Sequence, residues 1–94
     1  MIKTFKEDLN TAVFTIKYVL DKRSPILWIF HYEEDGSWQF SGEEEIISDE
    51  EYRVISLEEI INLDNSVLEV SDMQLEYMAY RDSVDHPWQI KRIE

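Results

Sequence analysis

Residues 26–32 constrain the fold of this chain most, because they are apolar on both faces of an extended strand. Read at a period of two, one face carries Ile26, Trp28, Phe30 and Tyr32, and the other carries Leu27, Ile29 and His31. A strand with one solvated face normally alternates apolar and polar side chains, whereas a strand buried on both faces does not. We therefore expect a strand here at the centre of a sheet, with His31 as a packed, hydrogen-bonded histidine.

The flanking patterns predict further strands. Residues 12–20 alternate and place Phe14, Ile16, Tyr18 and Leu20 on one face, which predicts one strand over the whole segment. Residues 22–25 turn the chain, and Asp35-Gly36 between two apolar runs predicts a β-hairpin. Residues 38–40 then open a third strand. We expect the first three strands to form a meander.

Two segments match the helix capping box S-x-x-E, one from Ser48 to Glu51 and one from Ser56 to Glu59. The apolar stripe that follows Ser56 predicts a strand over 52–55 and then a short helix from Leu57, which ends within 62–65. The alternative is one longer helix from Asp49, which the β-branched residues at 54 and 55 disfavour.

Two later segments, 75–80 and 88–93, are candidates for further strands. The predicted fold class is α+β, a mostly antiparallel sheet of four to six strands with one or two helices on one face. A chain of 94 residues with 44% hydrophobic content is expected to form one domain over residues 1–94.

Composition indicates a cytoplasmic protein. The chain has no cysteine, which removes disulfides and thiol chemistry and fits a reducing compartment. The longest uninterrupted apolar run, residues 26–30, is five residues, against the roughly 20 that a membrane span needs. The first ten residues contain no apolar segment typical of a secretory signal. We expect a soluble protein without a membrane partner.

Charge is concentrated in one segment. Residues 33–51 hold nine acidic residues and no Lys or Arg, so −9 of the formal net charge of −12 lies there. Such a field repels nucleic acid and attracts basic proteins. The alternative is a solvated loop that only keeps the protein soluble. Trp38 and Phe40 sit inside this segment on one face, and each predicts either core packing or an interface anchor.

Motifs for catalysis, metals and cofactors are missing. The two histidines, His31 and His86, lack the ligand spacing of a zinc site, and the acidic segment lacks the calcium-loop pattern. Two glycines supply neither kind of nucleotide-binding loop, and no G-x-S-x-G supports a Ser-His-Asp triad. We expect no catalytic residues, no metal and no cofactor, with a small hydrolase as the alternative left open.

The middle of the chain resembles a known family. Residues 38–44 read W-Q-F-S-G-E-E, similar to a W-x-F-x-G-[DE]-E motif, and V-I-S-L-E-E-I-I at 54–61 and D-N-S-V-L at 64–68 follow in order. This order resembles small bacterial domains of unknown function that are catalogued as predicted immunity proteins of polymorphic-toxin systems. The match covers residues 38–68. The resemblance implies a small α+β fold, no catalysis and binding to a cognate toxin.

The resulting hypothesis is a non-enzymatic acidic domain that neutralises a basic, toxin-like protein by covering it. The candidate partner-binding residues are Trp38, Glu43, Glu44, Glu45, Asp49, Glu50 and Glu51. The alternative is a bacterial regulatory or scaffold module that forms a homodimer through a sheet edge. The sequence leaves monomer and homodimer undecided.

Overall fold

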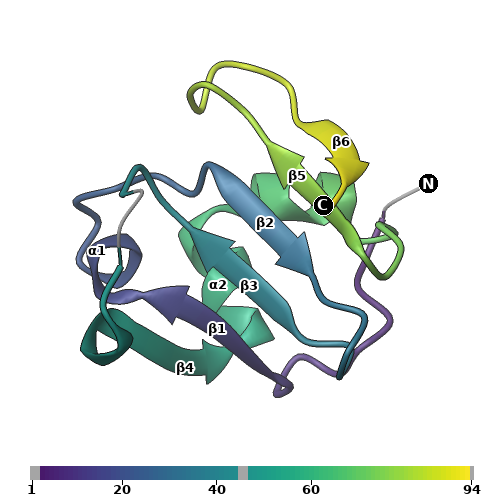
Figure 1. Ribbon diagram of the computed structural model, residues 1–94, viewed down its shortest axis with the longest axis horizontal. Coiled ribbons are helices and arrows are strands. Elements are labelled where there is room, and N and C mark those ends of the chain that lie inside the picture. Colours follow the sequence, from purple (N-terminus) through teal and green to yellow (C-terminus); the bar gives the residue numbers. More distant parts are fainter. Residues whose placement is uncertain (1–2, 45–46, 94) are drawn as a thin grey trace.

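A computed structural model describes residues 3–44 and 47–93, and its sheet and helices appear in Figure 1. The elements in chain order are β1 (Ala12–Ile16), α1 (Lys17–Leu20), β2 (Trp28–His31), β3 (Trp38–Ser41), η1 (Asp49–Glu51), β4 (Tyr52–Ser56), α2 (Leu57–Leu63), η2 (Asn65–Val70), β5 (Tyr77–Tyr80) and β6 (Gln89–Arg92). The fold is α+β with a six-stranded, mostly antiparallel sheet, as predicted.

The strand order is β4-β1-β3-β2-β5-β6, and the predicted meander is wrong. β3 lies between β1 and β2 and pairs with β1 in parallel, with Thr15 opposite Phe40. The connection from β1 to β2 runs through α1 and is longer than the roughly two to five residues of a hairpin loop, so it leaves room for a strand. The β2–β3 hairpin fills that space. Gly36, at a φ of 73°, makes the hairpin turn as expected.

The predicted strand over 12–20 is also wrong in its second half. The strand ends at Ile16, and residues 17–20 form the single helical turn α1. Ile16 and Val19 are both buried, at a spacing of three residues that fits a helical turn and not a strand. The Tyr18 hydroxyl donates a hydrogen bond to the carboxylate of Glu51, which ties α1 to the chain that leads into β4.

Both predicted capping boxes are used, and each starts a different element. Ser56 begins α2: the Glu59 backbone N–H donates to Ser56 Oγ at 3.2 Å, and the Ser56 N–H donates to the Glu59 carboxylate at 3.4 Å. Ser48 begins only the short 3₁₀ turn η1, so the longer helix from Asp49 is wrong. The prediction of a strand followed by a short helix from Leu57 is confirmed.

Helix α2 and the 3₁₀ segment η2 cover one face of the sheet and lie behind it in Figure 1. The core forms between that face and these two segments. Its fully enclosed members include Val13, Ile29, Phe40, Leu57, Ile60 and Val67. Within the described residues, no helix combines the length and the apolar character needed to cross a bilayer. The opposite face of the sheet, toward the viewer in Figure 1, has no helix over it among the described residues.

Candidate functional site

The uncovered face of the sheet carries apolar side chains where polar ones are usual. The side chains on this face point away from the core residues of the same strands, and we call the surface the open face. It comprises Phe14, Trp28, Phe30, Tyr32, Gln39, Tyr52, Val54 and Tyr80. Phe14 and Trp28 are 39% and 38% exposed, and Val54 is 61% exposed. Strand β2 therefore lies at the centre of the sheet as predicted, but only one of its two apolar faces is covered.

The aromatic side chains of the open face are held by one another. Trp28 lies opposite Tyr80 on the neighbouring strand, and their rings stack at 5.8 Å. Phe30 and Tyr32, two positions apart on the same side of the chain, stack at 5.7 Å with nearly parallel rings. Such pairs contribute stability beyond the area that they bury. The rings are thus ordered without an overlying layer.

A cleft of about 370 Å³ opens in this face beside the end of β3. Its lining residues are Trp28, Phe30, Gln39, Ser41, Glu44, Ile47 and Tyr52. The polar groups of β3 are already paired, because Gln39 accepts from the Tyr32 hydroxyl at 3.3 Å and donates to Ser41 Oγ at 3.1 Å. Burial, followed by the nearby Tyr52 and Glu34, raises the pKa of Tyr32, so its hydroxyl remains a donor at neutral pH.

Glu44 is the charged residue of the cleft. Its Oε1 atom is buried and has no hydrogen-bond partner among the described residues. A buried carboxylate oxygen without a donor is destabilising, so buried oxygens of this kind are nearly always paired. Because Glu44 lines the cleft, a cation bound there supplies a counter-charge to its carboxylate.

The acidic segment does not form one continuous surface. Glu33, Glu34 and Asp35 lie in the β2–β3 hairpin, and the remaining acids follow the other end of β3. Four residues of extended strand separate the two groups by about 13 Å. Glu43, Glu44, Asp49 and Glu50 belong to the second group, which we call the acidic rim. Glu45 was predicted with them and lies outside the described residues.

Glu51, also predicted as a binding residue, has a structural role. Its carboxylate accepts hydrogen bonds from the Tyr18 hydroxyl and, at 2.9 and 3.1 Å, from the hydroxyl and backbone N–H of Ser48. These donors, Tyr18 first, lower its pKa to about 2. The carboxylate stays ionised at neutral pH, and it holds η1 against α1.

Of the two alternatives predicted for Trp38, core packing is the one observed, and the side chain does not lie on the surface as a partner-binding residue would. The side chain is 2% exposed on the core face, where Phe5 packs edge-on at 5.0 Å and the His31 ring stacks at 3.8 Å. Its indole N–H donates to the Glu7 carboxylate at 3.0 Å. Period-two alternation puts Trp38 and Phe40 on the same side as Ile29, so the covered face receives all three.

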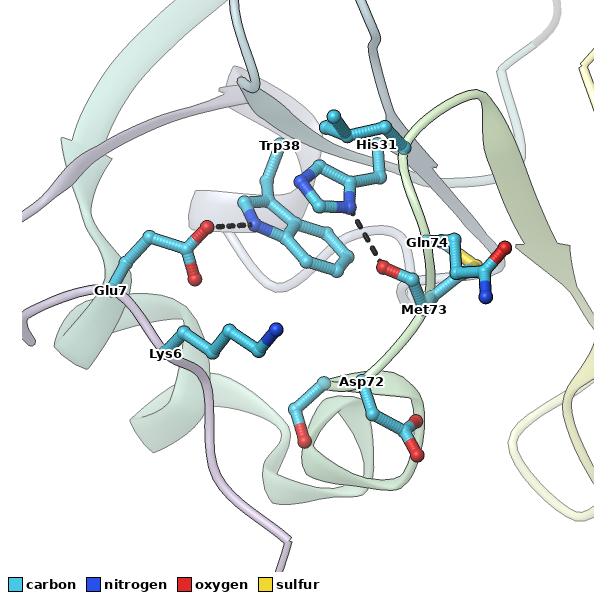
Figure 2. Close-up of a pocket in the computed structure, with 9 residues that line it drawn as sticks. Lys6, Glu7, His31, Trp38, Asp72, Met73 and Gln74 are labelled. Atoms are coloured by element: carbon cyan, nitrogen blue, oxygen red, sulfur yellow. Dashed lines mark hydrogen bonds between the residues drawn. The ribbon is translucent and has the colours of Figure 1, made fainter.

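A second cavity, of about 430 Å³, lies beside Trp38 and His31 at the hairpin end of the core (Figure 2). The Met73 carbonyl can only accept, so His31 Nδ1 carries the proton and donates to it at 2.8 Å. Ser71 is the one hydroxyl among the described lining residues, and it donates to the Leu68 carbonyl at 2.8 Å. These polar groups already have partners within the fold, and His31 is the packed, hydrogen-bonded residue that was predicted.

Among the described residues, no group of three or more His, Asp or Glu side chains is placed to hold a metal ion. The sequence-based prediction missed the aromatic residues of the open face, above all Trp28, Phe30 and Tyr52. The sequence did contain a signal for these residues, because a central strand that is apolar on both faces requires a covering layer on each face of the sheet. The helical segments predicted from the sequence were placed on one face only.

Comparison of the chain with protein-family models, with curated proteins and with solved structures finds no match.

Proposed function

We propose that this protein is a non-enzymatic binding domain that covers a basic protein partner with its open face and acidic rim. The observation that carries the proposal is the aromatic surface of the open face, on which Phe14 and Trp28 are exposed and the other rings are half-buried. Contiguous apolar patches on soluble domains mark interaction sites, and aromatic residues are enriched at the centres of interfaces.

Charge supports a basic partner. One residue of the acidic rim, Glu44, lines the cleft of the open face, and the chain as a whole has a formal net charge of −12. A basic surface is attracted by this field, which raises the association rate at low salt. Nucleic acid and a second copy of the chain carry charge of the same sign and are repelled.

The resemblance of residues 38–68 to predicted immunity proteins supports a more specific form of the proposal. In this form the partner is a cationic toxin, and the domain neutralises it in the cytoplasm by covering it. Neutralisation by covering needs a preformed surface and no catalytic group. The ordered aromatic stacks of the open face meet the first requirement.

Self-association through a sheet edge is the alternative. The edge strands are β4 and β6, and every residue of β6 is exposed. β6 carries Lys91 and Arg92, and basic side chains on an edge strand oppose pairing with another strand. We therefore favour a partner of different sequence. Light scattering separates the two, because the scaffold alternative requires a stable dimer.

The test of the proposal is affinity capture from a lysate of the source organism with three forms of the protein: wild type, Val54→Lys and Val84→Lys. Val54 is 61% exposed on the open face, and Val84 is 55% exposed in the β5–β6 connection, so the two changes are matched in chemistry and exposure. Lysine is tolerated on an edge strand such as β4.

We expect wild type and Val84→Lys to retain one basic protein in near-equal amounts, and Val54→Lys to lose it by tens-fold. The interaction should weaken as salt is added, because the charges are exposed. Equal retention by both lysine variants would place the interface elsewhere. Failure of wild type to retain any basic protein, with a stable dimer in light scattering, would favour the scaffold alternative.

A further inference from the structure

We infer that the cleft beside Glu44 is a socket for an arginine side chain of the partner. This inference rests on the proposed function and names the group that the open face recognises. It is drawn from the chemistry of the cleft, which combines one carboxylate with three aromatic walls.

The first observation is the charge of Glu44 in the cleft lining. Glu44 lines the cleft, and its carboxylate accepts no hydrogen bond at the buried Oε1 atom from a described residue. Two basic side chains near the rim are committed elsewhere: Lys17 Nζ lies 5.3 Å from the centre of the Tyr18 ring, and Arg53 donates to the Glu50 and Tyr52 carbonyls at 2.7 and 2.8 Å. The cleft thus presents a negative group to an incoming donor.

The second observation is the lining. Trp28, Phe30 and Tyr52 form the apolar walls of the cleft, and the volume of about 370 Å³ is small for a ligand pocket but sufficient for one long side chain. A cation over an aromatic face is attracted by the ring, and the attraction grows when water is excluded. The aliphatic part of an arginine side chain covers apolar surface at the same time.

The protein builds the same combination inside its own fold. The Arg81 guanidinium lies 4.1 Å from the centre of the Trp88 ring and donates to Asp64 at 2.7 Å. There a tryptophan, a carboxylate and a guanidinium meet. The cleft is also lined by a tryptophan and a carboxylate, Trp28 and Glu44, and none of its described lining residues carries a guanidinium.

Arginine fits this cleft better than lysine. Its guanidinium is planar, stacks on aromatic rings, is weakly hydrated and donates two parallel hydrogen bonds to a carboxylate. The lysine ammonium is strongly hydrated and offers no planar face. A neutral side chain of the same shape leaves the Glu44 carboxylate without a counter-charge.

The test uses three capped tripeptides as probes, Ac-Gly-X-Gly-NH₂ with X as arginine, lysine or citrulline, the uncharged isostere of arginine. Each is titrated into ¹⁵N-labelled protein, and the shifts of the Trp28 indole and Gln39 side-chain amide signals are followed. We expect the arginine peptide to bind about tenfold or more tightly than the citrulline peptide and severalfold more tightly than the lysine peptide. Equal shifts with arginine and citrulline would overturn the socket.

Two variants locate the effect. Glu44→Gln removes the charge of the cleft, and Glu69→Gln removes the same charge from an exposed position on η2, on the covered side of the sheet. We expect Glu44→Gln to abolish the preference for arginine over citrulline and Glu69→Gln to preserve it. Equal loss in both would assign the binding to net charge and overturn the socket. Unchanged dispersion of the remaining amide signals confirms that each variant is folded.

The outcomes separate the socket from the proposed function. If Val54→Lys releases the captured partner while the arginine peptide shows no preference, the function stands and the socket is wrong. If wild type captures no basic partner, the proposed function is wrong, and the peptide titration alone decides whether the cleft binds guanidinium.

Discussion

Replacement of Arg81 by Met is expected to remove a large part of the stability of this domain. The Arg81 side chain is 3% exposed and donates to the Ile26 carbonyl through two nitrogens, at 2.9 and 3.1 Å. It also donates to Ser66 Oγ at 3.0 Å and to Asp64 at 2.7 Å, with the Trp88 ring against its plane. One side chain thus joins β5 to the start of β2 and to the α2–η2 junction.

The magnitude follows from what methionine leaves behind. It fills most of the volume, but the Ile26 carbonyl loses two donors and the Asp64 carboxylate loses its counter-ion. Removal of one partner from a buried ion pair costs about 3–5 kcal/mol. Asp64 is 24% exposed, so water recovers part of the loss and we expect about 3 kcal/mol. A chain of 94 residues has roughly 5–14 kcal/mol in total.

Urea denaturation followed by tryptophan fluorescence measures this loss. For an m-value of about 1.5 kcal/mol/M, the Arg81→Met midpoint should fall by about 2 M. The matched control is Arg92→Met, because the Arg92–Glu76 pair at 2.9 Å is exposed and such pairs contribute only about 0–1 kcal/mol. An Arg81→Met loss within 1 kcal/mol of the control would refute the reasoning.

The contribution of the Arg81–Asp64 ion pair to stability should also depend on pH in the acid range. Burial raises the pKa of Asp64, but the hydrogen bonds from Ser66 and Arg81 lower it by more than burial raises it. The pKa of Asp64 is therefore below its ordinary value of 3.8. The stability from this carboxylate is therefore complete above about pH 4 and is lost as the pH falls below 3.8. Asp64→Asn should be less stable than wild type at pH 7, and the difference should shrink in acid.

Two further results are expected from the residues that hold the acidic rim. The Glu51 carboxylate should titrate with a pKa of about 2, measured by carbon NMR. Its contribution to stability should be lost as the pH falls from 4.5 to about 2. Tyr18→Phe should raise the pKa of Glu51 toward 4.5. A Glu51 pKa unchanged by Tyr18→Phe would contradict the assigned donor. Gly42→Ala should cost about 1–3 kcal/mol in urea denaturation, because its Cβ would lie 2.8 Å from Ser24 Cβ and 3.0 Å from the Pro25 carbonyl. Wild-type stability in Gly42→Ala would show that the 24–25 segment moves aside easily.

Local patterns predicted the elements well because their causes are local. The hairpin turn at Gly36 and the helix start at Ser56 depend on residues within three positions of each other. Strand order depends on contacts between distant segments. A meander and the observed order place the same side chains of β3 on the same face, so alternation cannot distinguish them. The parallel pairing of β1 with β3 was therefore out of reach.

The candidate site was predicted in part for the same reason. Charge density along the chain located the acidic rim, but it could not show that Glu51 is bound to Tyr18. For Trp38 the sequence left core packing and an interface anchor open, and the fold places the side chain in the core. The settings of Trp38 and Glu51 each involve a partner more than 30 residues away, as in the bonds from Trp38 to Glu7 and from Tyr18 to Glu51.

The two faces of the sheet have different roles, because one packs against the helices to form the core and the other carries the aromatic residues of the open face. The covered face holds Trp38, Phe40 and the helices, and the buried Arg81 ties that layer together. Stacking between neighbouring rings keeps the open face ordered, which reduces the entropy that a partner must overcome. The capping box from Ser48 to Glu51 contributes charge to the acidic rim. Within it, Glu51 fixes η1, and the adjacent Asp49 and Glu50 remain exposed.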